Sequence, residues 1–207
     1  MRNVLVLRLT LTLFRQLGTN MKPVKTVEYN GKKIYVYENV FDRRENFGLY
    51  NLIVNAPFTR TNIDVYLLNN KDFDSKWWSV ISPDSKISST VNPRYMETLD
   101  ALDWNKVAVT GQYINYSSSN SVDNLHADVF DEKNRYTILH YANHTWDVNW
   151  HGETVFYSDT CDEVIYTQII KPGSVVVFDS RIQHSAVPCS SASASPRFTI
   201  ATKLFLR

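Results

Sequence analysis

The sequence predicts an α+β domain in which N-terminal helices support a double-stranded β-helix, or jelly roll, over about residues 104–207. Two observations carry this prediction. One hairpin pattern and two helical patterns come first, and a series of short apolar or alternating segments separated by turn signals follows them. The composition agrees, because 12 Tyr, 10 Phe and 5 Trp beside only 6 Gly favour β structure. An ordinary β-sandwich would show the same strand spacing and stays open.

The length and the charge limit the classes of function. A chain of 207 residues commonly forms one domain, and we expect that domain over 21–207. The formal net charge is only +1, so no large basic field attracts a phosphate backbone. We therefore expect no nucleic-acid partner.

Residues 1–20 need a separate explanation. A positive residue precedes an apolar run, as in a signal peptide, but Arg8 interrupts the run and no small-x-small cleavage site follows. The stretch is also too short and too charged to cross a bilayer. Two explanations stay open: an amphipathic appendage, or a leader translated from an upstream start, with Met21 as the natural first residue.

The two cysteines, Cys161 and Cys189, lie far apart and form no CxxC motif. Unpaired thiols are typical of intracellular proteins. We therefore expect free cysteines, a cytoplasmic location and no membrane association.

The first elements are a hairpin and a helix. Residues 24–29 and 33–40 alternate in the manner of strands and flank Asn30-Gly31, a strong signal for a tight hairpin turn. Asp42 with Glu45 has the spacing of a capping box, which predicts a helix that ends before Pro57.

The next elements are a strand over 59–68 and a second helix over 93–102. Turn signals then separate the short segments expected to form the jelly roll, which are 107–116, 135–142, 152–157, 163–170, 174–179 and 197–206. The polar stretch 117–124, SSSNSVDN, is expected to be a loop within this β region.

Two triplets have the form His-x-Asp/Glu: His126-Ala127-Asp128 and His151-Gly152-Glu153. Two imidazoles and one carboxylate can bind a non-haem iron on one face and leave the opposite face open. The best third ligand is His184, which follows the apolar strand 174–179. About four strands fit between Asp128 and His184, which returns the chain to the same end of the roll.

The second triplet has room for only two or three strands before His184, so we expect that His151 and Glu153 bind no metal. Gly152 is better explained by backbone that passes close to another part of the fold. His140 and His144 are interpreted as a strand residue and a loop residue.

The last predicted strand begins with Arg197-Phe198-Thr199. Strand alternation places Arg197 and Thr199 on one face, and the planar guanidinium of an arginine binds a carboxylate through two parallel hydrogen bonds. If Arg197 is buried beside the candidate iron site, it requires an anion. We expect that anion to be a ligand.

The order of these motifs resembles a known family. HxD, GETVF, a Pro-Gly turn, VVVFDSRIxH and RxTxAxK follow one another between residues 107 and 206. This order is similar to that of the iron(II)- and 2-oxoglutarate-dependent dioxygenases, and within them to the prolyl 4-hydroxylase-like branch of bacterial or viral type. Arg197 stands where collagen-type prolyl hydroxylases use a lysine.

The resemblance implies a role for each matching residue. His126, Asp128 and His184 would bind Fe(II), and Arg197, helped by Thr199, would bind the distal carboxylate of 2-oxoglutarate. Two tyrosines complete the implied cosubstrate site: Tyr141, on the same carboxylate, and Tyr113, on the strand before HxD. The 117–124 stretch separates Tyr113 from His126, so the match of Tyr113 to the family is weaker than that of Tyr141. Whether this stretch acts as a lid stays open.

The resemblance also implies the reaction. A C–H bond, in a peptidyl side chain such as that of proline, would be hydroxylated with consumption of O2 and release of succinate and CO2, and ascorbate would support the activity. Two alternatives stay open: hydroxylation of a free amino acid or another small metabolite, and a non-catalytic jelly-roll module that binds a metal.

Overall fold

A computed structural model describes residues 20–60, 77–119, 121, 123–128 and 134–207. The possible leader, except for Asn20, and residues 61–68 of the predicted strand lie outside the described residues. At the start of the described chain, the backbone N–H of Met21 donates to the carbonyl of Thr98 over 2.9 Å.

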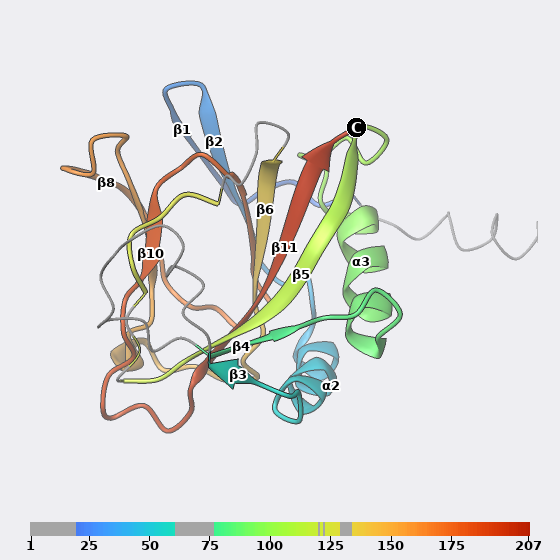
Figure 1. Ribbon diagram of the computed structural model, residues 1–207, viewed down its shortest axis with the longest axis vertical. Helices are drawn as coiled ribbons and strands as arrows, with labels where there is room; N and C mark the ends of the chain where they lie inside the picture. Colours follow the sequence, from blue (N-terminus) through green and yellow to red (C-terminus); the bar gives the residue numbers. More distant parts are fainter. Residues whose placement is uncertain (1–19, 61–76, 120, 122, 129–133) are drawn as a thin grey trace, which may run out of the picture.

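Two antiparallel sheets form the described β structure (Figure 1). The larger sheet has the strand order β1-β2-β9-β6-β11-β5-β4-β3, and the smaller has the order β10-β7-β8. The larger sheet consists of β1 (Lys25–Tyr29), β2 (Lys32–Tyr37), β3 (Thr59–Arg60), β4 (Trp77–Val80), β5 (Val107–Ser117), β6 (Asn134–Tyr141), β9 (Val175–Asp179) and β11 (Arg197–Leu206). The smaller sheet consists of β7 (Thr154–Tyr157), β8 (Val164–Gln168) and β10 (His184–Ala186).

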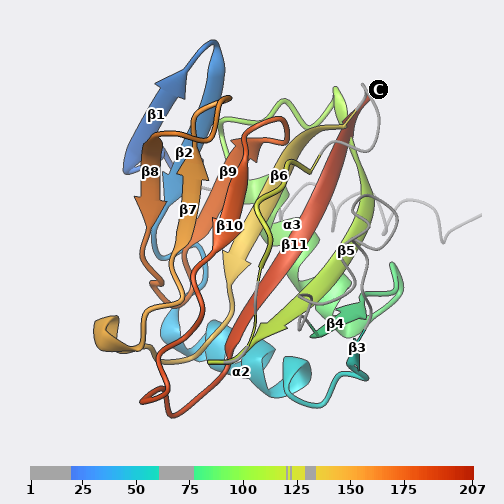
Figure 2. The same ribbon diagram turned by 60° about the vertical axis from the view of Figure 1, so that its left-hand side comes forward.

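The helices α2 (Arg43–Ile53) and α3 (Lys86–Thr98) lie on one face of the larger sheet, and the smaller sheet covers the other face (Figure 2). A short 3-10 helix, η3 (Val148–Trp150), precedes β7. This arrangement confirms the predicted α+β class with a jelly-roll core. Within the described residues, no helix has both the length and the apolar character that crossing a bilayer requires.

The predicted hairpin and its helix are confirmed. Asn30 and Gly31 connect β1 to β2 with φ values of 49° and 71°, as a tight turn between twisted strands demands. At the start of α2, the Asp42 carboxylate accepts from the backbone N–H of Glu45, and the Glu45 carboxylate accepts from that of Asp42. This reciprocal pair satisfies two backbone donors that a helix start leaves unpaired.

The predicted bounds of the second helix, 93–102, were wrong at both ends, since α3 ends at Thr98. α3 begins at Lys86, because the Ser85 hydroxyl accepts from the backbone N–H of Ser88 and caps the helix there. Pro93 lies inside the helix with an exposed side chain, rather than at its first turn. Proline often marks a helix start, but here the serine cap well before it sets the start.

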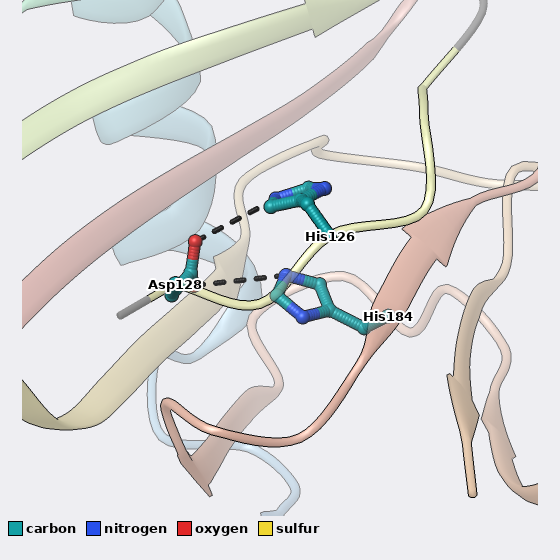
Figure 3. A group of neighbouring side chains, drawn as sticks. All are labelled: His126, Asp128 and His184. Carbon is teal, nitrogen blue, oxygen red and sulfur yellow. Dashed lines mark ion pairs between the residues drawn. The ribbon is translucent and has the colours of Figure 1, made fainter. Parts of the chain in front are cut away.

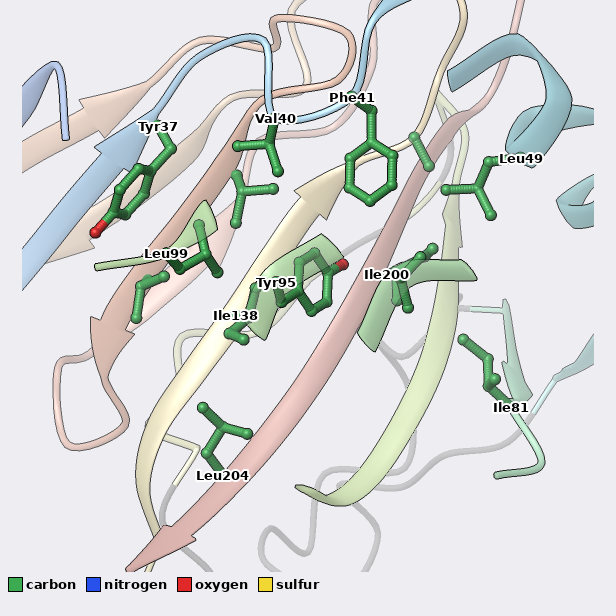
Figure 4. Close-up of a cluster of buried hydrophobic side chains, with 14 of the residues drawn as sticks. Tyr37, Val40, Phe41, Leu49, Ile81, Tyr95, Leu99, Ile138, Ile200 and Leu204 are labelled. Carbon is green, nitrogen blue, oxygen red and sulfur yellow. The ribbon is translucent and has the colours of Figure 1, made fainter. Parts of the chain in front are cut away.

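Apolar side chains form a core on each face of the larger sheet. Figure 4 shows the core on the helical side, where Leu49 of α2 and Tyr95 of α3 belong to one cluster with Ile138 and Ile200 of the sheet. The core on the other face, which continues into the smaller sheet, contains Leu139, Tyr141, Phe156, Ile170, Phe178, Ile182 and Ala201. All five residues of β9 are buried, as its apolar sequence predicted. Both cysteines are free thiols: Cys161 is exposed and Cys189 is buried.

Candidate metal centre

His126 and His184 are brought together by the backbone. They form an isolated antiparallel bridge in which each N–H donates to the other residue's carbonyl, over 3.1 Å from His126 and 2.8 Å from His184. Residues paired in this way project their side chains from the same face of the sheet. The two imidazole centroids accordingly lie 4.5 Å apart. The HxD segment therefore extends the smaller sheet beside β10.

Asp128 completes the group (Figure 3). Its backbone N–H donates to the carbonyl of Ser180, and its carboxylate oxygens Oδ1 and Oδ2 lie 3.6 Å from the Nε2 atoms of His126 and His184, respectively. One ligand atom from each of the three residues lies within 4.8 Å of the others. The sequence-predicted trio thus converges in space, and two imidazoles with one carboxylate form a donor set suited to a divalent transition metal.

The imidazoles are oriented by carbonyls behind them. Nδ1 of His126 lies 2.7 Å from the carbonyl oxygen of Asn124, and Nδ1 of His184 lies 3.0 Å from that of Ile182. Because a carbonyl only accepts, each Nδ1 carries a hydrogen, and a neutral ring in this orientation presents the lone pair of Nε2. Burial lowers the pKa of His184 to about 4, which keeps its imidazole neutral at neutral pH, as a metal ligand must be.

The Asp128 carboxylate is buried and held by the larger sheet. The Thr137 hydroxyl donates to Oδ2 over 2.8 Å, and the ammonium of Lys203 forms an ion pair with the same oxygen. Burial alone raises the pKa of Asp128, but the opposing effects, of which the charge of Lys203 is the largest, outweigh it and hold that pKa well below its usual range. Asp128 is therefore a carboxylate, the form that binds a metal.

Lys203 was not predicted as a site residue. It belongs to the RxTxAxK motif, and the alternation that puts Arg197 and Thr199 on one face of β11 puts Lys203 on that face too. Burial lowers the pKa of Lys203, but the attraction of Asp128 prevails and raises it. This spacing was the available signal for Lys203.

The competing triplet lies outside the group. The side chain of His151 is 60% exposed and lies 3.6 Å from the carboxylate of Glu153. In the described parts of the chain, only the trio His126, Asp128 and His184 gathers as a candidate metal site. Gly152 has the predicted close approach, because its φ is +83° and a Cβ there would lie 2.9 Å from Cδ1 of Ile170 and 3.3 Å from the Trp146 indole.

The other two histidines have the expected positions. His140 is a fully buried strand residue that stacks on Phe41 with a centroid distance of 4.4 Å, and its Nε2 lies 3.1 Å from the amide oxygen of Asn46. His144 lies in the loop after β6, where its ring contacts that of Tyr50. Neither belongs to the metal trio.

Arg197 lies on the same face of β11, and a terminal nitrogen donates to the Thr154 hydroxyl over 2.8 Å. The Tyr141 hydroxyl donates to the same oxygen over 2.7 Å, and the guanidinium carbon lies 5.6 Å from the centre of the Tyr141 ring. Tyr141 is also the direct cross-strand partner of Thr199. Three of the predicted cosubstrate residues therefore meet on one patch of the sheet.

That patch contains buried polar atoms without partners. Nε of Arg197, Oγ1 of Thr199 and Oγ of Ser117 make no hydrogen bond to any described residue, and no described carboxylate forms an ion pair with Arg197. Ser117 is the cross-strand partner of Arg197 on β5 and was not predicted individually. A buried guanidinium without an anion is costly, so these groups fit a carboxylate-bearing ligand.

Tyr113 lies further along the sheet. It is the cross-strand partner of Ala201, and its ring centre lies 5.5 Å from the Lys203 ammonium. Of the predicted cosubstrate residues, Tyr113 is therefore the one beside Lys203 rather than beside Arg197.

Comparison with known families bears on what this site does. Residues 111–204 match the family model described as the 2OG-Fe(II) oxygenase superfamily, in which 2OG is 2-oxoglutarate. This match covers somewhat less than half of the chain, so it shows a similarity of this region to the superfamily. The matched region runs from β5 to β11 and includes the trio, Arg197 and Lys203. The predicted resemblance to the 2-oxoglutarate-dependent oxygenases is thereby confirmed.

Solved structures share the fold. A prolyl-4-hydroxylase from Pseudomonas putida is 12% identical, with a TM-score of 0.59 over 84% of this chain and 92% of that chain. A prolyl hydroxylase from Trichoplax adhaerens, in complex with a peptide of hypoxia inducible factor, is 17% identical, with a TM-score of 0.60 over 99% of this chain and 94% of the other. HygX from Streptomyces hygroscopicus, with nickel and 2-oxoglutarate bound, is 11% identical, with a TM-score of 0.61 over 84% and 82%. No curated protein matches the sequence.

Proposed function

We propose that this chain is an Fe(II)- and 2-oxoglutarate-dependent dioxygenase that hydroxylates a C–H bond, with iron bound by His126, Asp128 and His184. The convergence of these three side chains carries the proposal. Their chemistry agrees with it, because two neutral imidazoles and one ionised carboxylate leave other positions of the metal open to ligands. The match of this region to the 2OG-Fe(II) oxygenase superfamily supports the choice of metal and cosubstrate.

Arg197 and Thr199 are proposed to bind the distal carboxylate of 2-oxoglutarate. The unpartnered Nε of Arg197 and Oγ1 of Thr199 support this role, since a carboxylate would satisfy both buried atoms. Tyr141 and Arg197 share the Thr154 hydroxyl, which fixes the guanidinium in place before the ligand arrives. We propose that Tyr141 helps to bind this carboxylate. Tyr113 is proposed to contact the cosubstrate from its position beside Lys203.

When bound, iron(II), 2-oxoglutarate and O2 would supply the oxidation. One oxygen atom of O2 would enter the substrate C–H bond and the other would leave in succinate, with release of CO2. The chain's own residues bind and orient the reactants. The carbonyls of Asn124 and Ile182 hold the imidazoles by Nδ1, so that each Nε2 would be available to a metal. Phe156 and Phe178 pack around the His184 ring and exclude water from that side of the site.

We propose a peptidyl side chain, such as that of proline, as the substrate. The Trichoplax adhaerens prolyl hydroxylase, which is similar over 99% of this chain, was solved with a peptide, and this supports the choice. A small-molecule substrate is the second candidate, because the similar HygX structure has been solved with hygromycin B bound.

Succinate formation from 2-oxoglutarate, measured with Fe(II), ascorbate and air, tests the activity. We expect turnover in the wild-type protein, a loss of at least about a hundredfold in the His126→Ala and Asp128→Ala variants, and wild-type turnover in His151→Ala, because metal-site residues are needed for every turnover. Turnover that survives His126→Ala or Asp128→Ala would contradict the assigned trio. No turnover together with no 2-oxoglutarate binding by calorimetry would favour the non-catalytic metal-binding module.

The same assay identifies the substrate class. Proline-containing peptides should increase succinate release and gain one oxygen atom by mass spectrometry, whereas free proline and other amino acids should do neither. Stimulation by free amino acids or small metabolites alone would replace the peptidyl assignment with the small-molecule candidate.

A further inference from the structure

Lys203 is a buried cation that contacts one residue of the candidate metal site. Its ammonium forms an ion pair with Oδ2 of Asp128 and lies 3.3 Å from the Thr137 hydroxyl. The side chain is only 7% exposed, and Thr137 is its direct cross-strand partner on β6. The proposed reaction assigns no role to this lysine.

The position of Lys203 creates a competition between cations. Asp128 is the one carboxylate of the trio, and a metal ion bound by the trio would share it with the ammonium. The ammonium of Lys203 offsets the negative charge of Asp128, whereas without Lys203 that charge would be left for a metal ion. Charges this close interact strongly in a buried site, so the ammonium opposes the arrival of a second cation.

A second described carboxylate near the trio, that of Asp123, does not take the place of Asp128 as the partner of Lys203. Asp123 lies 3.8 Å from Nδ1 of His126, on the side of that ring away from the Nε2 that faces Asp128. Its carboxylate also accepts from the backbone N–H of Ala186, so it is engaged at the smaller sheet. Lys203, by contrast, contacts a ligand oxygen itself.

We propose that Lys203 limits the affinity of the trio for a divalent metal, so that the metal is held firmly only when the dianionic cosubstrate binds with it. This inference rests on the proposed function. The two negative charges of 2-oxoglutarate offset the ammonium, and linkage requires that each ligand strengthen the binding of the other. Lys203 thereby acts as a positioning residue that favours joint loading of metal and cosubstrate.

Calorimetric titration of the full chain with Mn²⁺, with and without 2-oxoglutarate, tests the inference. Lys203→Gln removes the charge but keeps a donor for Asp128, Lys203→Met removes both, and Lys203→Arg keeps the charge. Without 2-oxoglutarate, the Gln and Met variants should bind Mn²⁺ at least about tenfold more tightly than the wild type, and the Arg variant should bind like the wild type. The gain in affinity from 2-oxoglutarate should be smaller in the Gln and Met variants.

A purely structural lysine gives the opposite result, because its loss would disturb Asp128 and weaken metal binding. Unchanged or weaker Mn²⁺ binding by the Gln and Met variants overturns the inference. If neither variant folds, as judged by circular dichroism, the wild type alone decides: an affinity for Mn²⁺ that 2-oxoglutarate leaves unchanged also overturns it. Absence of Mn²⁺ binding by the wild type would instead refute the proposed metal site, which separates the two failures.

Discussion

Arg197 and Lys203 are two buried cations on one face of β11, but their contacts with other groups differ in charge. Lys203 has a carboxylate partner in Asp128, whereas the described contacts of Arg197 are hydroxyl and aromatic groups. A buried cation paired within the chain is complete without a ligand, but one paired only with dipoles is not. This difference assigns the carboxylate of the cosubstrate to Arg197 rather than to Lys203.

Replacement of Arg197 by alanine should raise the KM for 2-oxoglutarate by roughly 10- to 100-fold, because charge-assisted hydrogen bonds to a carboxylate are lost. Steady-state succinate assays over a range of 2-oxoglutarate concentrations measure this effect. Mn²⁺ affinity without 2-oxoglutarate should stay close to that of the wild type, because the described contacts of Arg197 do not include the trio. Arg197→Lys, which keeps the charge but loses the planar fork, should give an intermediate KM. An unchanged KM in the alanine variant would mean that another cation binds the cosubstrate.

The sequence alone predicted a role for Arg197 and Thr199 but none for Lys203, and the reason is physical. Alternation along one strand is a local property, so the sequence alone places Arg197 and Thr199 on a shared face. It does not say what lies opposite that face. The partner of Lys203 comes from the HxD segment and that of Arg197 on β5 is Ser117, and both depend on register between strands distant in sequence.

At the scale of elements, the metal trio depends on a pairing that the sequence did not reveal. His184 was expected just beyond an apolar strand, but it begins the three-residue strand β10, which also pairs with β7. So short a strand has no recognisable period. The pairing of its first residue with His126, which lies outside the named strands, brings the two imidazoles together. The spacing of the motifs along the sequence predicted which three residues form the trio. The backbone pairing of His126 with His184 brings their side chains together.

The turn before β9 gives a prediction about stability. Gly173 has a φ of +76°, and a Cβ there would overlap the carbonyl oxygen of Phe41. Gly31 has a similar φ of +71°, with nothing within 4 Å of such a Cβ. Gly31→Ala should therefore cost about 1 kcal/mol of backbone strain, and Gly173→Ala about 3 kcal/mol or more, because overpacking adds to the strain.

Urea denaturation of both variants measures the difference in the free energy of unfolding. Equal losses at the two sites would show that the loop containing Phe41 moves aside readily. β9 follows Gly173 and precedes His184 in the chain. A larger loss at Gly173 would therefore show that the packing of this turn against Phe41 contributes to the stability of the segment that leads to His184.

At the scale of the whole molecule, the candidate site joins the two sheets. His126 and His184 belong to the smaller sheet and its extension, whereas the Asp128 carboxylate contacts Thr137 of β6 and Lys203 of β11 in the larger sheet. The resemblance to the family and the fold class were predictable, because the order of motifs and of short strands is a property of the sequence. The order of strands within each sheet was not, because it is set by packing between the layers.

A metal bound across this junction should stabilise the whole domain. A ligand that binds only the folded state at about a hundred times its Kd adds about 2.7 kcal/mol, which for a domain of this size raises Tm by roughly 5–10 °C. Differential scanning calorimetry with 2-oxoglutarate present in every sample should show this rise in the wild type when Mn²⁺ is added at about a hundred times its Kd. His126→Ala should lose most of the rise, because one of three ligands is removed. Glu153→Gln should keep it, because Glu153 lies outside the trio. An equal rise in both variants would place the stabilising metal somewhere other than the junction of the two sheets.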